Sequence, residues 1–260
     1  MEKLLKKIKD IPKNPKLIVF DLDGTLAPSK SDLDSEMASL LQQLLDTKIV
    51  AVIGGAKYEQ FQRQFLDKLQ VPPELLKNLF LFPTTAASFY RYKNGSWEQV
   101  YSEKLSADEK KRIFEALEAT FKELGYSHPE KIYGELTEDR GIQVTFSALG
   151  QQAPLNLKEK WKKEHTVDKL KIAEVLQKHI PDLEVRAAGY TSIDVTRKGI
   201  DKEYGIRQIK KHLGISFDEM LFVGDALFEG GNDYPALRTG VACLEVNGPE
   251  ETKELIRALL

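Results

Sequence analysis

The chain has 260 residues, of which 42% are hydrophobic and 30% charged, a composition that fits a folded protein and argues against disorder. Its formal net charge of -2 provides no overall positive field, so we expect no nucleic-acid partner. No apolar run is long enough to span a membrane, although residues 1–10 form a basic, amphipathic segment that we expect to be a surface helix. The single cysteine, Cys243, has no partner for an internal disulfide, which favours a cytoplasmic location.

The first predicted element is a buried strand over residues 16–20, which ends in Asp21, Asp23 and Gly24. Ligands of a parallel sheet bind at the carboxyl ends of its strands. Two carboxylates this close repel each other unless a cation lies beside them, and oxygen ligands suit Mg²⁺. A carboxylate next to such a cation can attack phosphorus. The simpler alternative is a polar turn after the strand, with Gly24 allowing the turn.

Strands and helices then alternate. We predict a helix over residues 32–47 capped by Ser31 or Asp32, a strand over 48–53, a helix over 57–69 and a strand over 79–83. This order predicts an α/β fold with a doubly wound parallel sheet. Gly54 and Gly55, between strand and helix, can present backbone N–H groups to an anion, although most glycines in such positions only make the turn.

The pattern changes from about residue 84. A hairpin over 90–101 turns at Asn94-Gly95, and it is followed by a helix over 107–124, a half-exposed strand over 141–146, charged helices over 158–179 and alternating residues over 183–196. This content is that of an α+β module. We therefore predict a cap domain, residues 84–188, inserted into a Rossmann-like core formed by residues 1–83 and 189–260.

The chain then returns to core-type elements: a helix from about 200 to 213 that carries Lys202, a strand over 220–225, a strand over 240–246 and a helix over 250–260. The strand over 220–225 ends in Asp225, and Asn232-Asp233 follow in the next loop. An exposed lysine, a turn and a helix cap would explain these three features separately. Their convergence with Asp21 and the glycine turn at one sheet edge instead predicts phosphoryl transfer.

Asp21-Leu22-Asp23-Gly24-Thr25-Leu26 resembles the first motif of the haloacid dehalogenase-like phosphotransferases. Residues 53–58, 222–225 and 229–234 are similar to the eukaryotic-type phosphomannomutase branch of that superfamily. The resemblance implies that Asp21 is the nucleophile, that Asp23 is the general acid/base and that Lys202 balances negative charge. It also implies a Mg²⁺ ion bound by the residues Asp21, Asp23 (through its backbone carbonyl), Asp225, and Asp233 or Asn232.

The same resemblance places Arg140, Ser192 and Asp194 where the cap contacts a sugar phosphate, and Lys30 where the family has a substrate-contacting arginine. Two departures stand out. The family has further arginines after the strand that follows Arg140, whereas residues 146–154 hold no basic residue here, and residues 83–86 replace the usual Glu-Asn-Gly. A mutase needs a second strong anion site, for which arginine forks are the usual device.

We therefore expect a Mg²⁺-dependent phosphatase of a small phosphorylated metabolite such as a sugar phosphate. The first alternative is a phosphomannomutase with altered cap contacts. The second is a non-catalytic domain that binds sugar phosphates, which the combination of Asp21, Asp23, Lys202 and Asp225 argues against. A small-molecule substrate is the expected partner, and a homodimer formed through the cap is left open.

Overall fold

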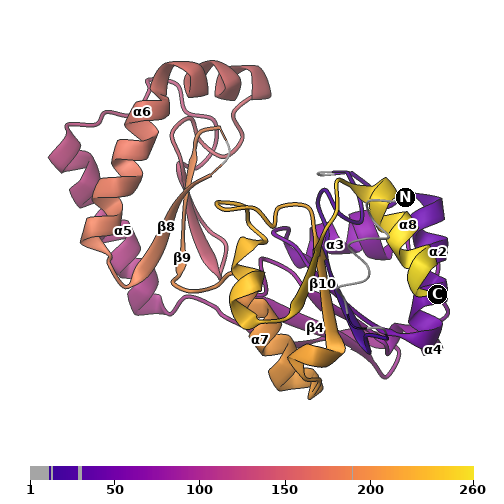
Figure 1. Cartoon of the computed structure of the whole chain (residues 1–260). Helices are drawn as coiled ribbons and strands as arrows, with labels where there is room; N and C mark the ends of the chain where they lie inside the picture. Colours follow the sequence, from indigo (N-terminus) through magenta and orange to yellow (C-terminus); the bar gives the residue numbers. More distant parts are fainter. Residues whose placement is uncertain (1–11, 13, 29–30, 189) are drawn as a thin grey trace. The chain divides into compact units, whose positions relative to one another are not determined.

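The computed structural model describes residues 12, 14–28, 31–188 and 190–260, which form two compact units (Figure 1). Unit 1 comprises Met1–Ser102 and Ile200–Leu260, and unit 2 comprises Glu103–Gly199. The predicted helix over residues 1–10 and the candidate residue Lys30 lie outside the described residues. Across the described ranges, no helix combines the length and apolarity needed to cross a bilayer.

Unit 1 is built on a seven-stranded sheet with the order β11-β10-β1-β2-β3-β4-β5. The first five strands in this order run parallel, and β4 and β5 are antiparallel. The strands are β1 Leu17–Asp21, β2 Ile49–Ile53, β3 Leu79–Phe82, β4 Ser88–Lys93, β5 Ser96–Ser102, β10 Met220–Gly224 and β11 Ala242–Glu245.

Both faces of the sheet are buried at the central parallel strands β1, β2, β3 and β10, as their continuous apolar runs predict. Ile18 and Phe20 of β1 belong to one core cluster with α2 (Ser35–Thr47) and α8 (Pro249–Leu259). Leu17 and Val19 belong to another cluster with α7 (Lys202–Leu213), which covers the opposite face (Figure 1). The predicted doubly wound architecture is confirmed.

Two helix starts differ from the prediction. Helix α2 is capped by Asp34, whose Oδ1 accepts a hydrogen bond from the Met37 N–H at 2.8 Å, and neither Ser31 nor Asp32 is the cap. The helix predicted over 57–69 is a four-residue α3, Tyr58–Phe61, followed by a π-helix, Gln62–Leu66. The apolar spacing of so short a segment does not separate α from π turns. The remaining short helices are α4 Pro73–Leu76, η2 Phe217–Glu219 and η3 Tyr234–Thr239.

Unit 2 has a four-stranded antiparallel sheet in the order β6-β7-β9-β8, packed against two helices. Its elements are α5 Ala107–Leu124, β6 Thr137–Asp139, β7 Gln143–Ser147, α6 Leu155–His179, β8 Leu183–Ala188 and β9 Ser192–Arg197. Helix α6 is interrupted at His165, where the backbone is not helical, so the prediction of one or two helices resolves into two joined segments. The α+β content of the predicted cap is confirmed.

The predicted boundaries of the cap need correction at both ends. The β4–β5 hairpin, predicted to lie in the cap, pairs with β3 in unit 1 through Phe80↔Arg91 and Leu81↔Tyr90. Strand β9, beyond the predicted boundary at 188, pairs with β7 and β8 in unit 2. Alternating residues identify a strand but not the sheet that it joins, because pairing partners distant in sequence decide that.

In unit 2, Arg197 joins the last strand to the start of the first helix. The Arg197 guanidinium at the end of β9 donates to both carboxylate oxygens of Glu109 in α5, at 3.0 and 2.9 Å, and to Glu103 at 3.2 Å. Glu109 also closes the capping box of α5 with Ser106. The Arg197 hydrogen bonds, followed by the contacts with Ser106, lower the pKa of Glu109 from 4.5 to about 2.

We predict that Glu109→Gln lowers the free energy of unfolding of unit 2 by about 1 kcal/mol at pH 7, since water screens a partly exposed pair. The folded pKa of Glu109 lies below its unfolded value. The stabilisation is therefore present above pH 4.5 and is lost as the pH falls from 4.5 towards about 2. Urea unfolding between pH 2 and 7 should show the two curves converging in acid. Glu115→Gln, on the exposed side of α5, is the control. A difference that does not change with pH would contradict the assignment.

Candidate active site

The central feature of unit 1 is a buried ammonium group. Asp201 caps α7 by accepting a hydrogen bond from the Tyr204 N–H, so the helix begins at Lys202. Lys202 is only 1% exposed, and its Nζ donates to Asp21 Oδ1 and to the Ile53 carbonyl (3.0 Å) and lies 3.1 Å from Asp233 Oδ1. The simpler interpretation of Lys202 as an exposed surface lysine is therefore wrong.

Burial and neighbouring charges together raise the pKa values of Asp21, Lys202 and Asp225. Burial raises the pKa of Asp21 to about 6; Lys202 opposes this shift and Asp233 adds to it. Burial by itself would lower the pKa of Lys202, but the attraction of Asp21 and Asp233 outweighs it, and the pKa of the ammonium is raised. Burial, followed by repulsion from Asp233, also raises the pKa of Asp225. Among the described residues, the site therefore holds more negative charge than the Lys202 ammonium can compensate.

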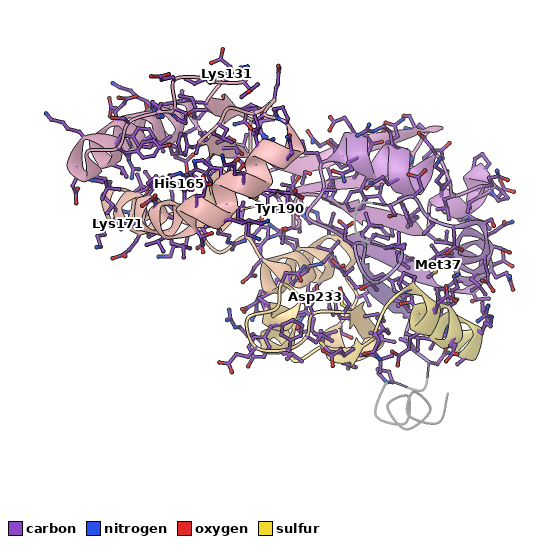
Figure 2. The ribbon with its side chains drawn as sticks, turned by 90° about the horizontal axis from the view of Figure 1, so that it is seen from above. Met37, Lys131, His165, Lys171, Tyr190 and Asp233 are labelled. Carbon is purple, nitrogen blue, oxygen red and sulfur yellow. The ribbon has the colours of Figure 1, made fainter. Side chains whose placement is uncertain are left out.

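Three carboxylates converge on this point. Asp21 ends β1 and Asp225 follows β10. Asp233, labelled in Figure 2, lies in the loop between β10 and η3. One oxygen atom of each lies within 4.8 Å of the others. Asp21 Oδ2 is buried without a hydrogen-bond partner among the described residues, whereas Asp233 Oδ1 lies 3.1 Å from the Lys202 ammonium. An unpartnered carboxylate oxygen within a cluster of three carboxylates fits a hard divalent cation such as Mg²⁺.

Two glycines make room for these carboxylates. A Cβ atom on Gly24 would lie 2.5 Å from Asp225 Oδ2, and one on Gly224 would lie 2.4 Å from Asp233 Oδ2. Gly24 has φ +89°, which confirms the predicted turn after Asp23. The absence of a Cβ atom at Gly24 and Gly224 therefore lets the backbone approach the Asp225 and Asp233 carboxylates closely.

The Gly54–Gly55 turn is held by the segment after β3. The Gly54 N–H donates to the Phe82 carbonyl at 3.3 Å, so it is already used, whereas Gly55 is exposed. The Thr84 and Thr85 N–H groups donate at 2.8 Å to the carbonyls of Ala56 and Gly54. Thr84, Thr85 and Ala86 all have left-handed φ values, of 54°, 54° and 66°. Such residues cost about 1–3 kcal/mol each, so the surrounding contacts must hold them there.

Two further candidates of unit 1, Asp23 and Asn232, lie outside the cluster of three carboxylates. Asp23 is half-buried, and its backbone forms a bridge with Ala27. Asn232 is exposed, whereas Asp233 is fully buried in the acidic cluster, so of these two predicted metal ligands the structure brings only Asp233 to the other carboxylates. Asp233 begins η3 without capping it through its side chain; instead its Oδ2 accepts a hydrogen bond from the Ala226 N–H.

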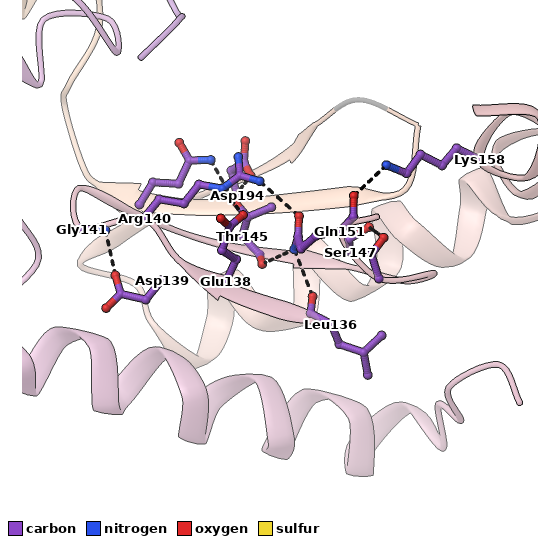
Figure 3. A network of polar contacts seen from close by, with 12 residues as sticks. Leu136, Glu138, Asp139, Arg140, Gly141, Thr145, Ser147, Gln151, Lys158 and Asp194 are labelled. Carbon is purple, nitrogen blue, oxygen red and sulfur yellow. Dashed lines mark hydrogen bonds and ion pairs between the residues drawn. The ribbon is translucent and has the colours of Figure 1, made fainter. Parts of the chain in front are cut away.

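The three candidates in unit 2 lie on its sheet. Ser192 and Asp194 are two residues apart on β9 and share one face of the sheet. Asp194 Oδ1 accepts a hydrogen bond from Thr145 Oγ1 at 2.8 Å, and burial raises the pKa of Asp194. Arg140 follows β6 and is bound by Glu138 and Gln151 (Figure 3). Arg140 and Asp194 are therefore parts of one polar network.

Several residues that contact the candidate residues were not predicted from the sequence. In unit 1, Thr25 Oγ1 donates to Asp225 Oδ1 at 3.3 Å, and the Ile53 carbonyl accepts from Lys202. Thr25 directly follows Asp23-Gly24, so its hydroxyl group could have been predicted to lie near the carboxylates. The Ile53 carbonyl belongs to the backbone, and no residue type indicates its role. In unit 2, Glu138 and Gln151 contact Arg140 across a turn, which the residues alone do not reveal.

The chain is similar to proteins of known family. A family model described as haloacid dehalogenase-like hydrolase matches residues 18–255. Phosphomannomutase of Saccharomyces cerevisiae is 27% identical over 227 residues, which cover 84% of this chain and 83% of that protein. Phosphomannomutase of Encephalitozoon cuniculi is 28% identical over 253 residues, which cover 91% and 90%.

Solved structures share the fold. An IMP-bound IMP-nucleotidase of Plasmodium falciparum, truncated at its N-terminus, matches 98% of this chain and 70% of that one, with a TM-score of 0.66 and 18% identity. Trehalose-6-phosphate phosphatase of Aspergillus fumigatus matches 99% of this chain and 96% of that one, with a TM-score of 0.62 and 16% identity. At these identities the likeness concerns the fold.

We predict that Lys202→Met lowers the free energy of unfolding by about 3–5 kcal/mol in the presence of a chelator, because two buried carboxylates lose their counter-charge. Added Mg²⁺ should restore part of the loss. Urea unfolding with and without Mg²⁺ measures both effects. Lys211→Met, exposed on the same helix, should change stability by less than about 0.5 kcal/mol. A loss below about 1 kcal/mol for Lys202→Met would show that the ammonium is not needed to hold the cluster.

Proposed function

The chain belongs to the haloacid dehalogenase-like hydrolases, and from that premise we propose that it is a Mg²⁺-dependent phosphatase of small phosphorylated metabolites, with sugar phosphates as the substrate class. Its membership makes it an enzyme of the phosphohydrolase or phosphotransferase type, so the non-catalytic alternative is set aside. The observation that supports the core of the proposal is the cluster of Asp21, Asp225 and Asp233, of which Asp21 and Asp233 contact the Lys202 ammonium.

The acidic cluster fits a metal ion on its own chemistry. Asp21, Asp225 and Asp233 would hold Mg²⁺, together with the backbone carbonyl of Asp23, and the ion would neutralise the carboxylates and polarise the phosphate. Asn232 is exposed, which favours Asp233 over it as the direct ligand. Lys202 fixes Asp21 through Oδ1.

The proposed reaction uses two carboxylates. An Asp21 oxygen attacks phosphorus, the bond from phosphorus to the leaving oxygen breaks, and Asp23 gives its proton to that oxygen. Asp23 then takes a proton from water, whose oxygen attacks the aspartyl-phosphate and releases inorganic phosphate. Lys202 stabilises the negative charge of the transferred group. The exposed Gly55 would donate its N–H to a phosphate oxygen, whereas Gly54 already uses its own.

Substrate recognition is assigned to unit 2 through Arg140, Ser192 and Asp194. The choice of phosphatase over mutase rests on the guanidinium group of Arg140, which is already paired with Glu138 at 2.6 Å. Residues 146–154 add no basic residue, and a mutase must hold a bisphosphate at two strong anion sites.

The relatives described above are both phosphomannomutases, which supports the alternative function. A phosphomannomutase therefore remains the second candidate. Lys158, whose Nζ donates to the Gln151 carbonyl at 3.1 Å, is a cation beside residues 146–154 that would serve such a reaction. A homodimer formed through unit 2 and a cytoplasmic location stay predictions.

We predict that chelation abolishes phosphate release from a generic aryl phosphate and that Mg²⁺ restores it, because the acidic cluster repels the substrate when no cation is bound. Asp21→Asn should lose at least about a thousandfold in kcat, since no nucleophile remains. Asp46→Asn, exposed on α2, is the matched control. Full turnover in excess chelator, or a near-normal rate for Asp21→Asn, would reject the site.

We predict release of inorganic phosphate from hexose monophosphates, with little or no isomerisation even when a hexose bisphosphate activator is present. A charge-assisted contact contributes about 1.5–3 kcal/mol, so the lack of two would loosen a distal phosphate by roughly a hundredfold or more. Parallel assays of phosphate release and of mannose-6-phosphate conversion to mannose-1-phosphate decide between the candidates. Efficient, activator-dependent conversion would establish the mutase.

A further inference from the structure

Helix α7 contains a glycine one turn beyond its buried lysine. Gly205 stands three residues after Lys202, so the two residues share one face of the helix. A glycine inside a helix is less stable there than an alanine, because it loses more backbone freedom on folding. Gly205 is buried, and it lacks the left-handed backbone angle that would itself require glycine. Its presence therefore needs another physical reason.

The neighbours of Gly205 supply that reason. A Cβ atom on Gly205 would lie 2.9 Å from the Cβ atom of Ala86 and 3.0 Å from Cδ1 of Ile53. Carbon atoms in favourable contact are about 3.5–4.0 Å apart, so both separations are too short. The end of the Ile53 side chain could turn aside, whereas the Ala86 Cβ atom can move only with its backbone.

The backbone around Ala86 is fixed by hydrogen bonds. The Ala86 N–H donates to the Phe82 carbonyl at 3.3 Å, and the Ala86 carbonyl accepts from the Tyr101 hydroxyl at 2.9 Å. The preceding N–H, that of Thr85, donates to the Gly54 carbonyl at 2.8 Å. Ala86 is also fully buried at a φ of 66°. Because this segment cannot readily retreat, an atom added to the facing side of α7 would push the helix away.

The close approach of α7 also brings the ammonium group to its partners. Lys202 Nζ donates to the Ile53 carbonyl at 3.0 Å and lies 3.1 Å from Asp233 Oδ1. Ile53 therefore meets α7 twice, through its carbonyl at Lys202 and through its side chain beside Gly205. The Lys202 side chain is buried and has little room to compensate for a shift of the helix. A displacement of about 1 Å would take Nζ out of hydrogen-bond distance.

We propose that Gly205 is a positioning residue for Lys202: its missing side chain lets α7 lie against Ala86, and this closeness places the ammonium at the carboxylates. The positioning follows from contacts within unit 1. Its effect on turnover rests on the proposed function, in which the ammonium stabilises the charge of the transferred phosphoryl group. Gly205 offers no group of its own to the reaction and acts through Lys202. Helix preference and the needs of the site thus conflict at this position.

The kinetic test pairs Gly205→Ala with a change that makes room for the new methyl group. Gly205→Ala should lower kcat for a generic aryl phosphate at least about tenfold per folded molecule, with KM changed less than about threefold. Ala86→Gly removes the facing Cβ atom and suits the left-handed angle. In that background, Gly205→Ala should leave kcat within about threefold of Ala86→Gly alone. Lys211→Ala, exposed on the same helix, is the matched control and should keep kcat within about twofold of the wild type.

A crystal structure of Gly205→Ala tests the positioning without turnover. Lys202 Nζ should lie more than about 3.5 Å from the Ile53 carbonyl oxygen, and it should return to hydrogen-bond distance in the variant that also carries Ala86→Gly. An ammonium that keeps its contacts in Gly205→Ala, or a loss of kcat that Ala86→Gly does not recover, would overturn the proposal. If Gly205→Ala does not fold, the double variant must fold with the ammonium in place, and its failure to do so would also overturn it.

The two arms of the test separate this role from the proposed function. A wild-type chain that releases no phosphate from any ester would reject the proposed function, and the crystal structures would still decide whether Gly205 positions the ammonium. A phosphatase in which Gly205→Ala leaves the ammonium in place would keep the proposed function and reject the positioning role.

Discussion

The structure of unit 1 depends on the buried contact of one ammonium group with two carboxylates. Lys202 reaches Asp21 at the end of β1, Asp233 after β10 and the Ile53 carbonyl at the end of β2, so it joins three neighbouring strands at their carboxyl ends. Taking such charges out of water is costly, and only close mutual contact repays the cost. This contact requires three features of the fold: the order of strands in the sheet, the cap at Asp201 that starts α7 at Lys202, and the buried position of Asp233.

The same acidic cluster explains where the backbone is unusual. Gly24 and Gly224 stand where a Cβ atom would collide with the Asp225 and Asp233 carboxylates, so both positions require glycine for close approach. The left-handed run Thr84–Ala86 has no glycine, yet its N–H groups hold the Gly54–Ala56 turn through two 2.8 Å hydrogen bonds. Backbone strain is tolerated here because it fixes the loop beside Lys202, and strained residues tend to occur where position matters more than stability.

The apolar periodicity of the chain predicted most elements, including the full extent of α5 over Ala107–Leu124, because local spacing and capping decide a helix. It did not predict that the β4–β5 hairpin joins the parallel sheet, since strand partners are set by distant residues. Within the site, the residue types at strand ends indicated Asp21 and Asp225, and Lys202 was indicated on the predicted helix that runs from about 200 to 213. The sequence did not decide between Asn232 and Asp233 as the buried residue, nor did it predict that Arg140 pairs with Glu138. Both outcomes depend on the direction in which a side chain points from a turn, and residue spacing does not predict that direction.

The two units differ in how they balance charge, and this difference bears on the reaction. In unit 1, the described residues gather three carboxylates and the Lys202 ammonium, so under the proposed function a divalent cation would be needed before a phosphate dianion could approach. In unit 2, the guanidinium groups of Arg140 and Arg186 each have a glutamate within 3.5 Å, so no cation is needed there and none of their charge is left over. Under the proposed function, uncompensated charge in unit 1 and paired charge in unit 2 would suit a substrate with a single phosphate. A mutase, which must exchange the two ends of a bisphosphate, would need comparable anion affinity in both units.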